Sequence, residues 1–349
     1  MKKIITFFIS VIFLFVLSCS VEDEYSSDAR TNFEALWKII DEHYCFFDYK
    51  DIDWDAMHEK YSVQVTDSMD KYHLFQLMGK MLAELKDGHT NLISSFNVSR
   101  FWDWSTDYPD NFNTVVHNKY LGKDYNIAGG MEYLILRDSI GYVYYGDFSN
   151  GVSESNLNEM FLHFKDCKAL IFDVRNNGGG ALSNSERIAS RFLEEKRLVG
   201  YIIHKTGPGH NDLSEPYPIE LQPTKYIKWL RPVAVLTNRS SYSATNDFVN
   251  KMKLFPQVTL IGDKTGGGCG LPFHSELPNG WSVRFSSSPI LDANKEYTEY
   301  GVDPDVKVDI EDNDQLNNID TIIEEAIEYL KKKTEGSKPE ISSAKYFNE

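Results

Sequence analysis

The sequence predicts a protein of the α/β class, in which a helical N-terminal subdomain precedes a core of mixed β-sheet and flanking helices. Two observations support this class. Between residues 30 and 87, apolar residues recur at steps of three and four, which is the period of an amphipathic helix. From about residue 132, short apolar runs typical of buried strands alternate with segments of helical period, as expected when helices pack on a sheet.

The first 18 residues have the composition of an export signal. Two lysines after the initiating methionine precede an apolar run over residues 4–17, which is shorter than the ~20 residues that a membrane-spanning helix needs. The run ends at Ser18-Cys19, which resembles the lipobox of bacterial lipoproteins, where a small residue precedes a lipidated cysteine. We therefore predict a lipoprotein signal peptide over residues 1–18, lipidation of Cys19 and a polar tether over residues 19–29. The protein would then be exported and anchored at the outer membrane, on its periplasmic or surface face, unless this is an ordinary secretory signal with a chance cysteine.

Composition narrows the classes of function. The formal charge is −16, and no basic stripe or cluster of basic and aromatic residues occurs, so nucleic acid is not an expected partner. With 42% hydrophobic residues, the chain can bury a sizeable core in one or two domains. Cys45, Cys167 and Cys269 lie far apart without metal-ligand spacing, so we expect no structural zinc. The spacing leaves open whether any two of them form a disulfide.

The helical N-terminal subdomain is predicted over residues 30–97. Two amphipathic stripes define it, comprising Phe33, Leu36, Trp37, Ile40 and Tyr44, and then Leu74, Leu77, Met78, Met81, Leu82 and Leu85. Residues 98–131 are rich in Asn, Asp, Tyr and Trp, and they show no clean period. They are therefore predicted to form an irregular connection.

The α/β core is predicted over residues 132–332, and a polar tail over residues 333–349. Strands are expected at 133–136, 140–145, 169–174, 198–204, 232–237 and 258–262. Helices are expected at about 152–165, from 184, from 244 and at about 314–332. Between the last strand and the last helix, residues 271–310 indicate hairpins, with a turn at Pro278-Asn279-Gly280.

Ser243 is a candidate nucleophile because it stands where a buried strand meets the start of a helix. An oxyanion formed there would be stabilised by the backbone N–H of Ala244, since helix N-termini present unpaired N–H groups and a positive dipole end. A serine at a helix start is most often an N-cap, however. Ser240 and Ser241 are rival candidates on the same grounds.

The run Gly178-Gly179-Gly180 follows another buried strand. Glycines there permit positive φ and close backbone approach, which suits a second oxyanion N–H and a groove in which Gly179 and Gly180 contact a bound peptide. No Lys-Ser/Thr pair follows, so a phosphate-binding loop is not supported, and a tight turn is the alternative. Asp173 and Arg175, which flank the strand end, are interpreted as structural charges that hold the loop.

A serine hydroxyl needs a base, because unaided it is too weak an acid to become a nucleophile. His89 follows an apolar helix at a glycine break, where a side chain can project into a cleft. Most lone histidines are surface residues or satisfied core residues, so spacing alone does not assign this role.

Five motifs occur in an order that resembles the C-terminal processing peptidase and tricorn-core family of serine peptidases, over about residues 30–332. They are Asp87-Gly88-His89-Thr90, Asp173-Val174-Arg175-Asn176-Asn177-Gly178-Gly179-Gly180, Ser241-Tyr242-Ser243-Ala244, Gly262-Asp263-Lys264-Thr265-Gly266-Gly267 and Gly301-Val302-Asp303-Pro304-Asp305. The resemblance implies an α/β core related to the Clp protease/crotonase superfamily. It also implies Ser243 as the nucleophile and an oxyanion hole built from the N–H groups of Ala244 and Gly178.

The family divides by the base that it uses. In one branch a lysine follows glycine in the segment equivalent to Thr265–Gly270, where this chain has glycine, and Lys264 is not at the matching position. The other branch resembles the tricorn core and pairs a histidine of the N-terminal subdomain with a glutamate shortly before the Gly-x-x-Pro-Asp motif. His89 matches the first role and Glu299 the second, with Glu296 as the alternative because the register is shifted.

The resemblance implies a serine peptidase acting on unfolded or short polypeptides, without a metal or an organic cofactor. His89 would take the Ser243 proton and then protonate the leaving amine, while Glu299 orients the imidazole. An imidazole with the ordinary pKa of about 6.5 would make activity fall below neutral pH. No peptide-binding PDZ module is evident, so recognition of substrate tails is not implied. The alternatives are an inactive ligand- or peptide-binding protein on the same scaffold and an ester hydrolase.

Overall fold

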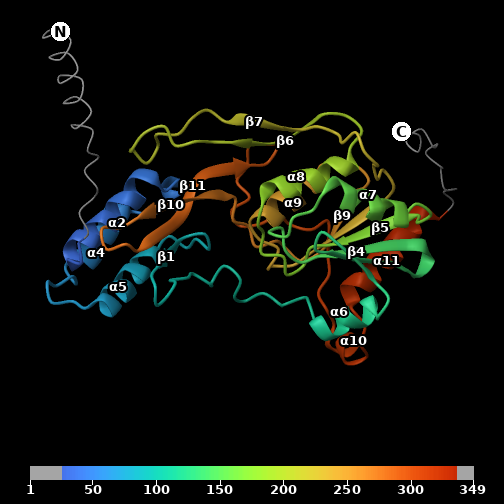
Figure 1. Cartoon of the computed structure of the whole chain (residues 1–349), viewed down its shortest axis with the longest axis horizontal. Helices are drawn as coiled ribbons and strands as arrows, with labels where there is room; N and C mark the ends of the chain where they lie inside the picture. Colours follow the sequence, from blue (N-terminus) through green and yellow to red (C-terminus); the bar gives the residue numbers. More distant parts are fainter. Residues whose placement is uncertain (1–25, 336–349) are drawn as a thin grey trace, which may run out of the picture.

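The computed structural model describes residues 26–335, which form two lobes (Figure 1). The predicted signal peptide, Cys19 and the tether up to residue 25 lie outside the described residues, as do residues 336–349 of the predicted tail. Within the described part of the chain, no helix combines the length and the apolar composition needed to span a bilayer.

Four helices of the N-terminal lobe meet with their apolar faces in one core. They are α2 (Ala29–His43), α3 (Phe47–Lys50), α4 (Trp54–Ser62) and α5 (Lys71–Ala83). The side chains of Asp28, Asp53 and Asp70 accept hydrogen bonds from first-turn amides and so begin α2, α4 and α5. Phe33 and Met78 of the predicted stripes are fully buried in this core, because the amphipathic faces of the helices point inward.

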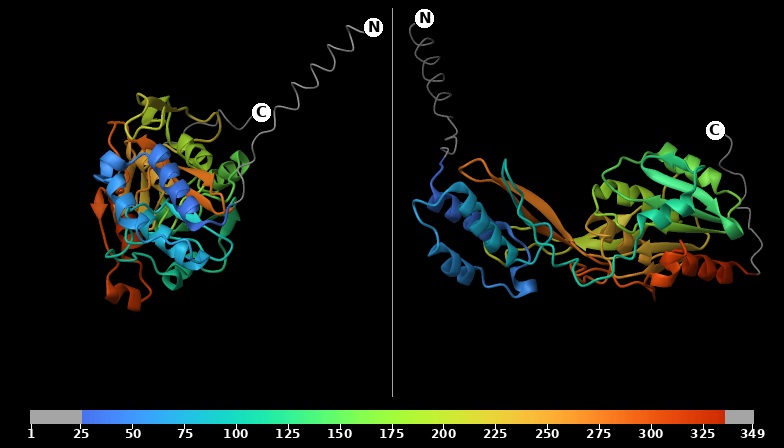
Figure 2. Two further views of the ribbon diagram at one scale, coloured as in Figure 1. Left: turned by 90° about the vertical axis from the view of Figure 1, so that its left-hand side faces the viewer. Right: turned by 90° about the horizontal axis from the view of Figure 1, so that it is seen from below.

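A long β-hairpin from the C-terminal half of the chain completes the N-terminal lobe (Figure 2). Strands β10 (Gly270–Glu276) and β11 (Ser282–Leu291) pair antiparallel, and β1 (Asn91–Ile93) pairs with β11 as well. Trp281 and Val283 are buried in the same core as the four helices. The lobe is therefore discontinuous in sequence, because the hairpin covers an apolar helix surface that would otherwise face water.

Two further strands extend the sheet that contains the hairpin, giving the order β1-β11-β6-β7. β6 (Arg197–Ile202) pairs with the end of β11, and β7 (Tyr217–Leu221) pairs antiparallel with β6. The sequence did not predict β7, which lies at the sheet edge and contains Pro218. A proline donates no backbone hydrogen bond, and an edge strand tolerates it.

The other lobe is built on a seven-stranded sheet in the order β12-β9-β8-β5-β4-β3-β2. Its strands are β2 (Asn126–Ala128), β3 (Met131–Leu136), β4 (Ile140–Tyr145), β5 (Ala169–Asp173), β8 (Val233–Thr237), β9 (Val258–Gly262) and β12 (Val306–Lys307). The strands from β12 to β4 run parallel, whereas β3 and β2 join them antiparallel. The predicted α/β class with a mixed sheet is confirmed.

Helices cover both faces of this sheet: α7, α8 and α9 pack on one face, and α6 and α11 on the other. Their bounds, with two 3₁₀ turns, are α6 (Thr114–Leu121), α7 (Glu154–His163), α8 (Leu182–Ala189), α9 (Ala244–Lys253), α11 (Thr321–Thr334), and Arg137–Ser139 and Ser190–Phe192. Every residue of β5 and β8 is buried because both faces are covered. The loops after β5, β8 and β9 gather at one sheet edge, where parallel strands end together.

Two segments differ from the sequence prediction. The helix expected at 314–332 is divided into α10 (Asp312–Leu316) and α11, with Asn318 between them at a φ of 60°. The Asp320 side chain accepts hydrogen bonds from two first-turn amides of α11, and this cap starts a new helix instead of continuing the old one. The segment 98–131, predicted to be irregular, contains α6 and β2.

Candidate active site

Ser243 lies in the turn between strand β8 and helix α9. Its backbone has φ 61° and ψ −121°, a region that residues other than glycine rarely occupy. The turn is held by the Ser243 amide, which donates to the Gly267 carbonyl at 2.8 Å, and by the Ser243 carbonyl, which accepts from the Asp247 amide at 3.0 Å. A strained strand-to-helix turn of this kind presents its side chain beyond the sheet edge.

The structure does not support the alternative interpretations, in which Ser243 is a helix cap or Ser240 or Ser241 is the nucleophile. The Ser243 side chain makes no capping hydrogen bond to α9. Ser241 is buried, and its hydroxyl donates to the Val174 carbonyl at 2.8 Å, which holds the loops after β5 and β8 together. Of Ser240, Ser241 and Ser243, only Ser243 lines the cavity that His89 also lines.

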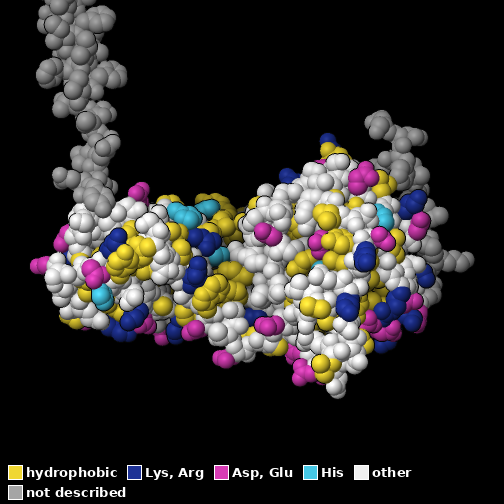
Figure 3. All heavy atoms as spheres, turned by 60° about the horizontal axis from the view of Figure 1, so that its bottom comes forward, with side chains coloured by type: hydrophobic (Ala, Val, Ile, Leu, Met, Phe, Trp, Pro, Cys, Tyr) yellow, Lys and Arg dark blue, Asp and Glu magenta, His cyan; other side chains and the backbone are white. Residues whose placement is uncertain are grey.

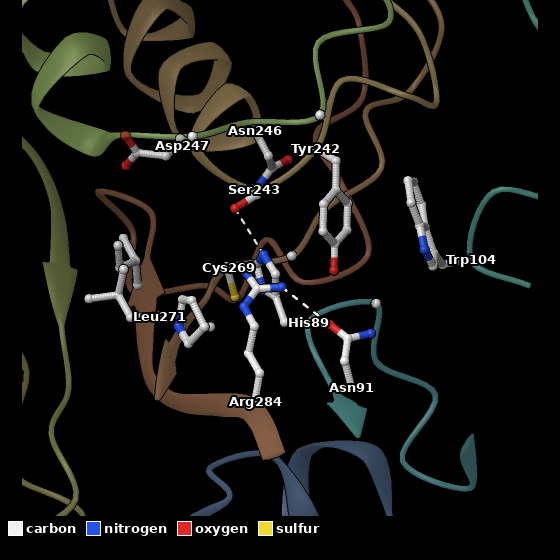
Figure 4. Close-up of a pocket in the computed structure, with 18 of the residues that line it drawn as sticks. His89, Asn91, Trp104, Tyr242, Ser243, Asn246, Asp247, Cys269, Leu271 and Arg284 are labelled. Atoms are coloured by element: carbon white, nitrogen blue, oxygen red, sulfur yellow. Dashed lines mark hydrogen bonds between the residues drawn. The ribbon is translucent and has the colours of Figure 1, made fainter. Parts of the chain in front are cut away.

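His89 comes from the other lobe, in the turn between α5 and β1. Its Nε2 lies 2.9 Å from Ser243 Oγ, although the two residues are 154 positions apart in sequence (Figure 4). The His89 amide donates to Asp87 Oδ1 at 2.8 Å, and the Tyr242 ring lies against the imidazole with the ring centroids 4.9 Å apart. The structure thus brings together the two residues singled out from the sequence as nucleophile and base.

The surroundings of His89 lower its pKa to about 4. Burial is the largest cause, the positive charges of Arg284 and Lys50 act in the same direction, and the negative charge of Asp87 opposes them. The imidazole is therefore neutral at physiological pH, and its Nε2 is able to accept a proton from Ser243. This replaces the expectation of an ordinary histidine pKa.

The acid limb of kcat/KM is expected near pH 4 rather than near pH 6.5. With His89 as the predicted base, the neutral imidazole is the active form, so kcat/KM should stay level down to about pH 5 and then fall about tenfold per pH unit below pH 4. Steady-state hydrolysis between pH 3.5 and 8 measures this. Circular dichroism at each pH is the control, because a folded pKa below the unfolded value destabilises the fold as pH falls from about 6.5 to 4. An acid limb at pH 6.5 with the protein folded would contradict the expectation.

Two residues that line the cavity with Ser243 have free backbone amides. The N–H of Ala244, the first residue of α9, and the N–H of Gly178, in the loop after β5, have no hydrogen-bond acceptor among the described residues. Both residues line the cavity. Free amides at this position can stabilise negative charge on a carbonyl oxygen attacked by the serine.

Gly179 was predicted to contact a bound peptide, but it does not line the cavity and instead packs against the Ser243 turn. Its amide donates to Asn177 Oδ1 at 3.0 Å and its carbonyl accepts from the Phe148 amide at 3.0 Å, so both groups already have partners within the protein. Gly180 does line the cavity. Gly179 has a φ of 104°, and a Cβ there would lie 2.8 Å from both Ser243 Cβ and the Tyr242 carbonyl oxygen.

Gly179→Ala is expected to lower the free energy of unfolding by about 1–3 kcal/mol. It should also lower kcat/KM of the molecules that stay folded. The added methyl group must displace the turn that carries Ser243. Urea unfolding and kcat/KM measured on the folded fraction separate the two effects. Gly151→Ala is the matched control, because a Cβ at Gly151 meets open space. Equal, small effects of both substitutions would contradict the expected crowding.

Glu299 is buried beside the site but does not contact the imidazole. One carboxylate oxygen accepts from Lys50 Nζ at 2.8 Å, and the other accepts from the Cys269 amide at 2.9 Å. Burial, followed by the negative charge of Asp87, raises the pKa of Glu299 to about 7, and Lys50 opposes the shift. Glu296 is exposed in a surface turn, so Glu299 is the one of the two candidates that lies near the site.

Lys50 was not singled out from the sequence, and it connects the two lobes behind the imidazole. Its side chain is 2% exposed. Nζ donates to the carbonyls of Lys86 at 3.2 Å and Leu85 at 3.4 Å, and it lies 3.9 Å from Asp87 Oδ2. Burial alone would lower the pKa of Lys50, but Asp87 and Glu299 outweigh burial and raise it. Lys50 therefore stays charged and holds the turn that carries the imidazole.

The cavity in front of Ser243 has a volume of about 430 Å³ and lies at the junction of the lobes. Its apolar lining comes from both lobes and comprises Val98, Phe101, Trp102, Trp104, Leu182, Leu271, Pro272 and Ile290. Trp104 stacks on Tyr242 with ring centroids 4.3 Å apart, and its carbonyl accepts from Arg239 Nε at 2.6 Å. The segment predicted to be an irregular connection thus forms one wall of the site.

Cys45, Cys167 and Cys269 are buried and unpaired. Among the residues from 26 to 335, no group of His, Cys, Asp or Glu side chains is arranged to hold a metal ion.

A strained serine, a neutral histidine on its hydroxyl and two free amides are the features of a serine hydrolase site. The family model of peptidase family S41 matches residues 139–308, and that of the tricorn protease C1 domain matches residues 25–83. A crystal structure of a candidate peptidase from Parabacteroides merdae is 62% identical, with a TM-score of 0.84 over 87% of this chain and 97% of that chain. The chain belongs to peptidase family S41, which confirms the predicted family.

Other relatives are more distant. A candidate tricorn-like protease C-terminal subunit from Sulfurisphaera tokodaii is 28% identical over 206 residues, which are 57% of this chain and 22% of that protein. The chain thus spans about a fifth of the length of that curated relative. The structure of mature CPAF is 11% identical and has the same fold, with a TM-score of 0.66 over 87% of this chain and 96% of that chain.

Proposed function

We propose that this chain is a serine peptidase that hydrolyses peptide bonds in unfolded or short polypeptides, with Ser243 as the nucleophile and His89 as the general base. The observation that carries the proposal is the 2.9 Å contact between His89 Nε2 and Ser243 Oγ. A neutral imidazole within hydrogen-bond reach of a serine hydroxyl is the arrangement that activates the serine for attack.

In the first step, Ser243 Oγ attacks the peptide carbonyl while its proton passes to His89 Nε2. The amides of Ala244 and Gly178 stabilise the negative charge that develops on the carbonyl oxygen. The imidazolium then protonates the leaving amine, which departs and leaves an acyl ester on Ser243. Water, deprotonated by the same imidazole, hydrolyses this ester and restores the serine.

The size and position of the cavity support short or unfolded substrates. At about 430 Å³, it accommodates a few residues of extended chain but not a folded domain. Its aromatic and aliphatic walls suit apolar side chains of such a chain. Export and lipidation at Cys19, with the site on the periplasmic or surface face of the outer membrane, stay predictions from the sequence.

A fluorophosphonate probe tests the proposal, because it reacts with activated serine hydroxyls. We expect labelling at Ser243, located by mass spectrometry of the labelled peptide, and loss of labelling in His89→Ala. Lys264→Ala is the matched control and should keep the label, since Lys264 pairs with Asp303 at 3.4 Å rather than with the serine. An unlabelled Ser243 would indicate a binding protein. Labelling with hydrolysis of esters but of no peptide in a mixed panel would indicate an ester hydrolase.

A further inference from the structure

Arg284 is a cation of the cavity that the proposed chemistry does not use. It stands on β11 directly across from Asn91 of β1, and its guanidinium points into the cavity beside His89 (Figure 4). Within the described residues it makes one hydrogen bond, a long one from Nη1 to Asn91 Oδ1 at 3.4 Å. No carboxylate of the described residues lies within 4.0 Å of it. Most of its five N–H donors therefore lack a protein partner.

Two fully buried arginines of the described residues are paired with carboxylates, whereas buried Arg239 donates to the backbone carbonyls of Trp104, Thr265 and Tyr300. Arg175 binds Asp173 at 2.6 Å and Asp320 at 3.0 Å, and Arg191 binds Glu154 at 2.5 Å. A partly desolvated guanidinium without an anion is unfavourable, and for this reason buried charges are normally paired. Burial lowers the pKa of Arg284, whereas Tyr242 and Asp87 oppose the shift. Arg284 has neither a carboxylate nor a set of carbonyls as partners, and it lies in the cavity where a substrate would bind.

The cavity is more positive than the chain as a whole. Of the described residues that line it, only Asp247 carries a carboxylate, and that group is bound to Lys251 at 2.5 Å and to the Ser185 hydroxyl at 2.8 Å. Arg100, an exposed lining residue, also has no carboxylate partner among the described residues. The chain has a formal charge of −16, and the face in Figure 3 intersperses Lys and Arg with Asp and Glu. Two unpaired arginines at the cavity therefore favour an anionic ligand.

The position of Arg284 indicates which part of a substrate it would meet. The imidazole must protonate the leaving amine, so the leaving segment lies on the side of the cavity next to His89. Resting on the proposed function, we propose that Arg284 binds a carboxylate of the leaving segment of the substrate. This carboxylate is either the terminal carboxylate of a short leaving segment or the side chain of an Asp or Glu close to the cleaved bond.

Binding of such a carboxylate would also act on the base. The charge of Arg284 lowers the pKa of His89 in the free protein. A carboxylate bound to the guanidinium offsets that charge and raises the pKa of the imidazole, which makes it a stronger base in the complex. Substrates with the carboxylate should therefore show an acid limb at higher pH in kcat than in kcat/KM.

Three quenched-fluorescent octapeptide pools of otherwise identical composition test the proposal. One ends in a free carboxylate, one ends in an amide, and one is amidated but carries Glu in place of Gln after the cleaved bond. The wild-type protein should prefer one of the two carboxylate pools over the neutral pool by about ten- to hundredfold in kcat/KM. Whether the first or the third pool is preferred identifies the source of the carboxylate.

Arg284→Gln should reduce this preference to about onefold, with the loss of kcat/KM falling mainly on the preferred carboxylate pool. Arg284→Lys, which keeps the charge but not the planar fork, should retain part of the preference. Arg197→Gln is the matched control, because Arg197 is exposed on β6 and does not line the cavity. An unchanged preference in Arg284→Gln, or an equal loss on all three pools, would overturn the proposal.

Affinities measured in the Ser243→Ala background separate this inference from the proposed function. Fluorescence anisotropy of the same pools reports binding without hydrolysis. A carboxylate preference in binding that disappears in Ser243→Ala/Arg284→Gln supports the Arg284 site even if no peptide is cleaved. Cleavage with no carboxylate preference in binding or in kcat/KM overturns the Arg284 site and leaves the peptidase proposal standing.

Discussion

Replacing Ser243 with alanine is expected to lower kcat/KM for peptide hydrolysis by about 10⁴- to 10⁶-fold. In the proposed mechanism the hydroxyl is the attacking group, and among the described residues Ser243 is the one side chain hydrogen-bonded to the imidazole of His89. A small rate above the uncatalysed reaction should persist, because the amides of Ala244 and Gly178 are backbone groups that the substitution leaves in place. Hydrolysis of a quenched-fluorescent peptide over several hours measures a loss of this size.

The same substitution is expected to change the free energy of unfolding by less than about 0.5 kcal/mol. Ser243 does not cap helix α9, so no cap is lost. Alanine also has the same Cβ as serine, and the positive φ therefore produces no new clash. Thermal unfolding followed by circular dichroism checks that the loss of activity is a loss of chemistry.

Ser241→Ala is the matched control, because Ser241 was the rival on sequence grounds. Its hydroxyl donates to the Val174 carbonyl and accepts from the Asn238 amide at 3.2 Å. Its loss should lower the free energy of unfolding by about 1–3 kcal/mol while activity per folded molecule stays within about tenfold of wild type. If Ser243→Ala kept activity within tenfold, or if Ser241→Ala lost as much, the nucleophile would be wrongly assigned.

The elements of the larger lobe could be predicted because their signals are local. An uninterrupted apolar run such as Ala169–Asp173 or Val233–Thr237 is the mark of a strand covered on both faces, and both strands are buried at every position. The candidate nucleophile and base could be found as well, since Ser243 follows one of these strands and His89 follows an amphipathic helix. The contact between these two residues depends on how the two lobes pack together. No local pattern in the sequence indicates that packing, and the contact was expected only because of the family resemblance.

What the sequence missed depends on contacts between distant segments. The N-terminal helices were predicted as a separate subdomain, yet the β10–β11 hairpin shares their core. This hairpin brings Arg284 to the cavity, and a period-two pattern cannot indicate which lobe a strand joins. Lys50 and Glu299 are 249 positions apart, and neither segment carries a local sign of the pairing. The sequence analysis predicted that Glu299 orients the imidazole, and it did not predict that Lys50 binds the Glu299 carboxylate.

Lys50→Met is expected to lower kcat/KM by about 10²-fold and the free energy of unfolding by about 3–5 kcal/mol. The Lys50 side chain is 2% exposed and bound to Glu299 at 2.8 Å. Its loss leaves two buried carboxylates, those of Glu299 and Asp87, without their cation. The turn that carries His89 also loses the hydrogen bonds to its carbonyls, so the imidazole is less firmly held against Ser243.

The pH profile distinguishes an effect on the base from a loss of fold. The charge of Lys50 lowers the pKa of His89, and its removal while Asp87 stays charged should raise that pKa above about 4. Because the neutral imidazole is the active form in the proposed mechanism, activity in Lys50→Met should decline at a higher pH than in the wild-type protein. A substitution that only loosened the packing would lower the rate without moving the acid limb.

Two further variants keep this expectation testable if Lys50→Met folds poorly. Lys50→Arg retains the charge and should keep both the position of the acid limb and most of the stability. Lys50→Met/Glu299→Gln removes one of the stranded carboxylates, so its free energy of unfolding should be higher than the sum of the two single effects predicts. Additive losses in the double variant, or a wild-type acid limb with kcat/KM within threefold in Lys50→Met, would show that Lys50 does not position the base.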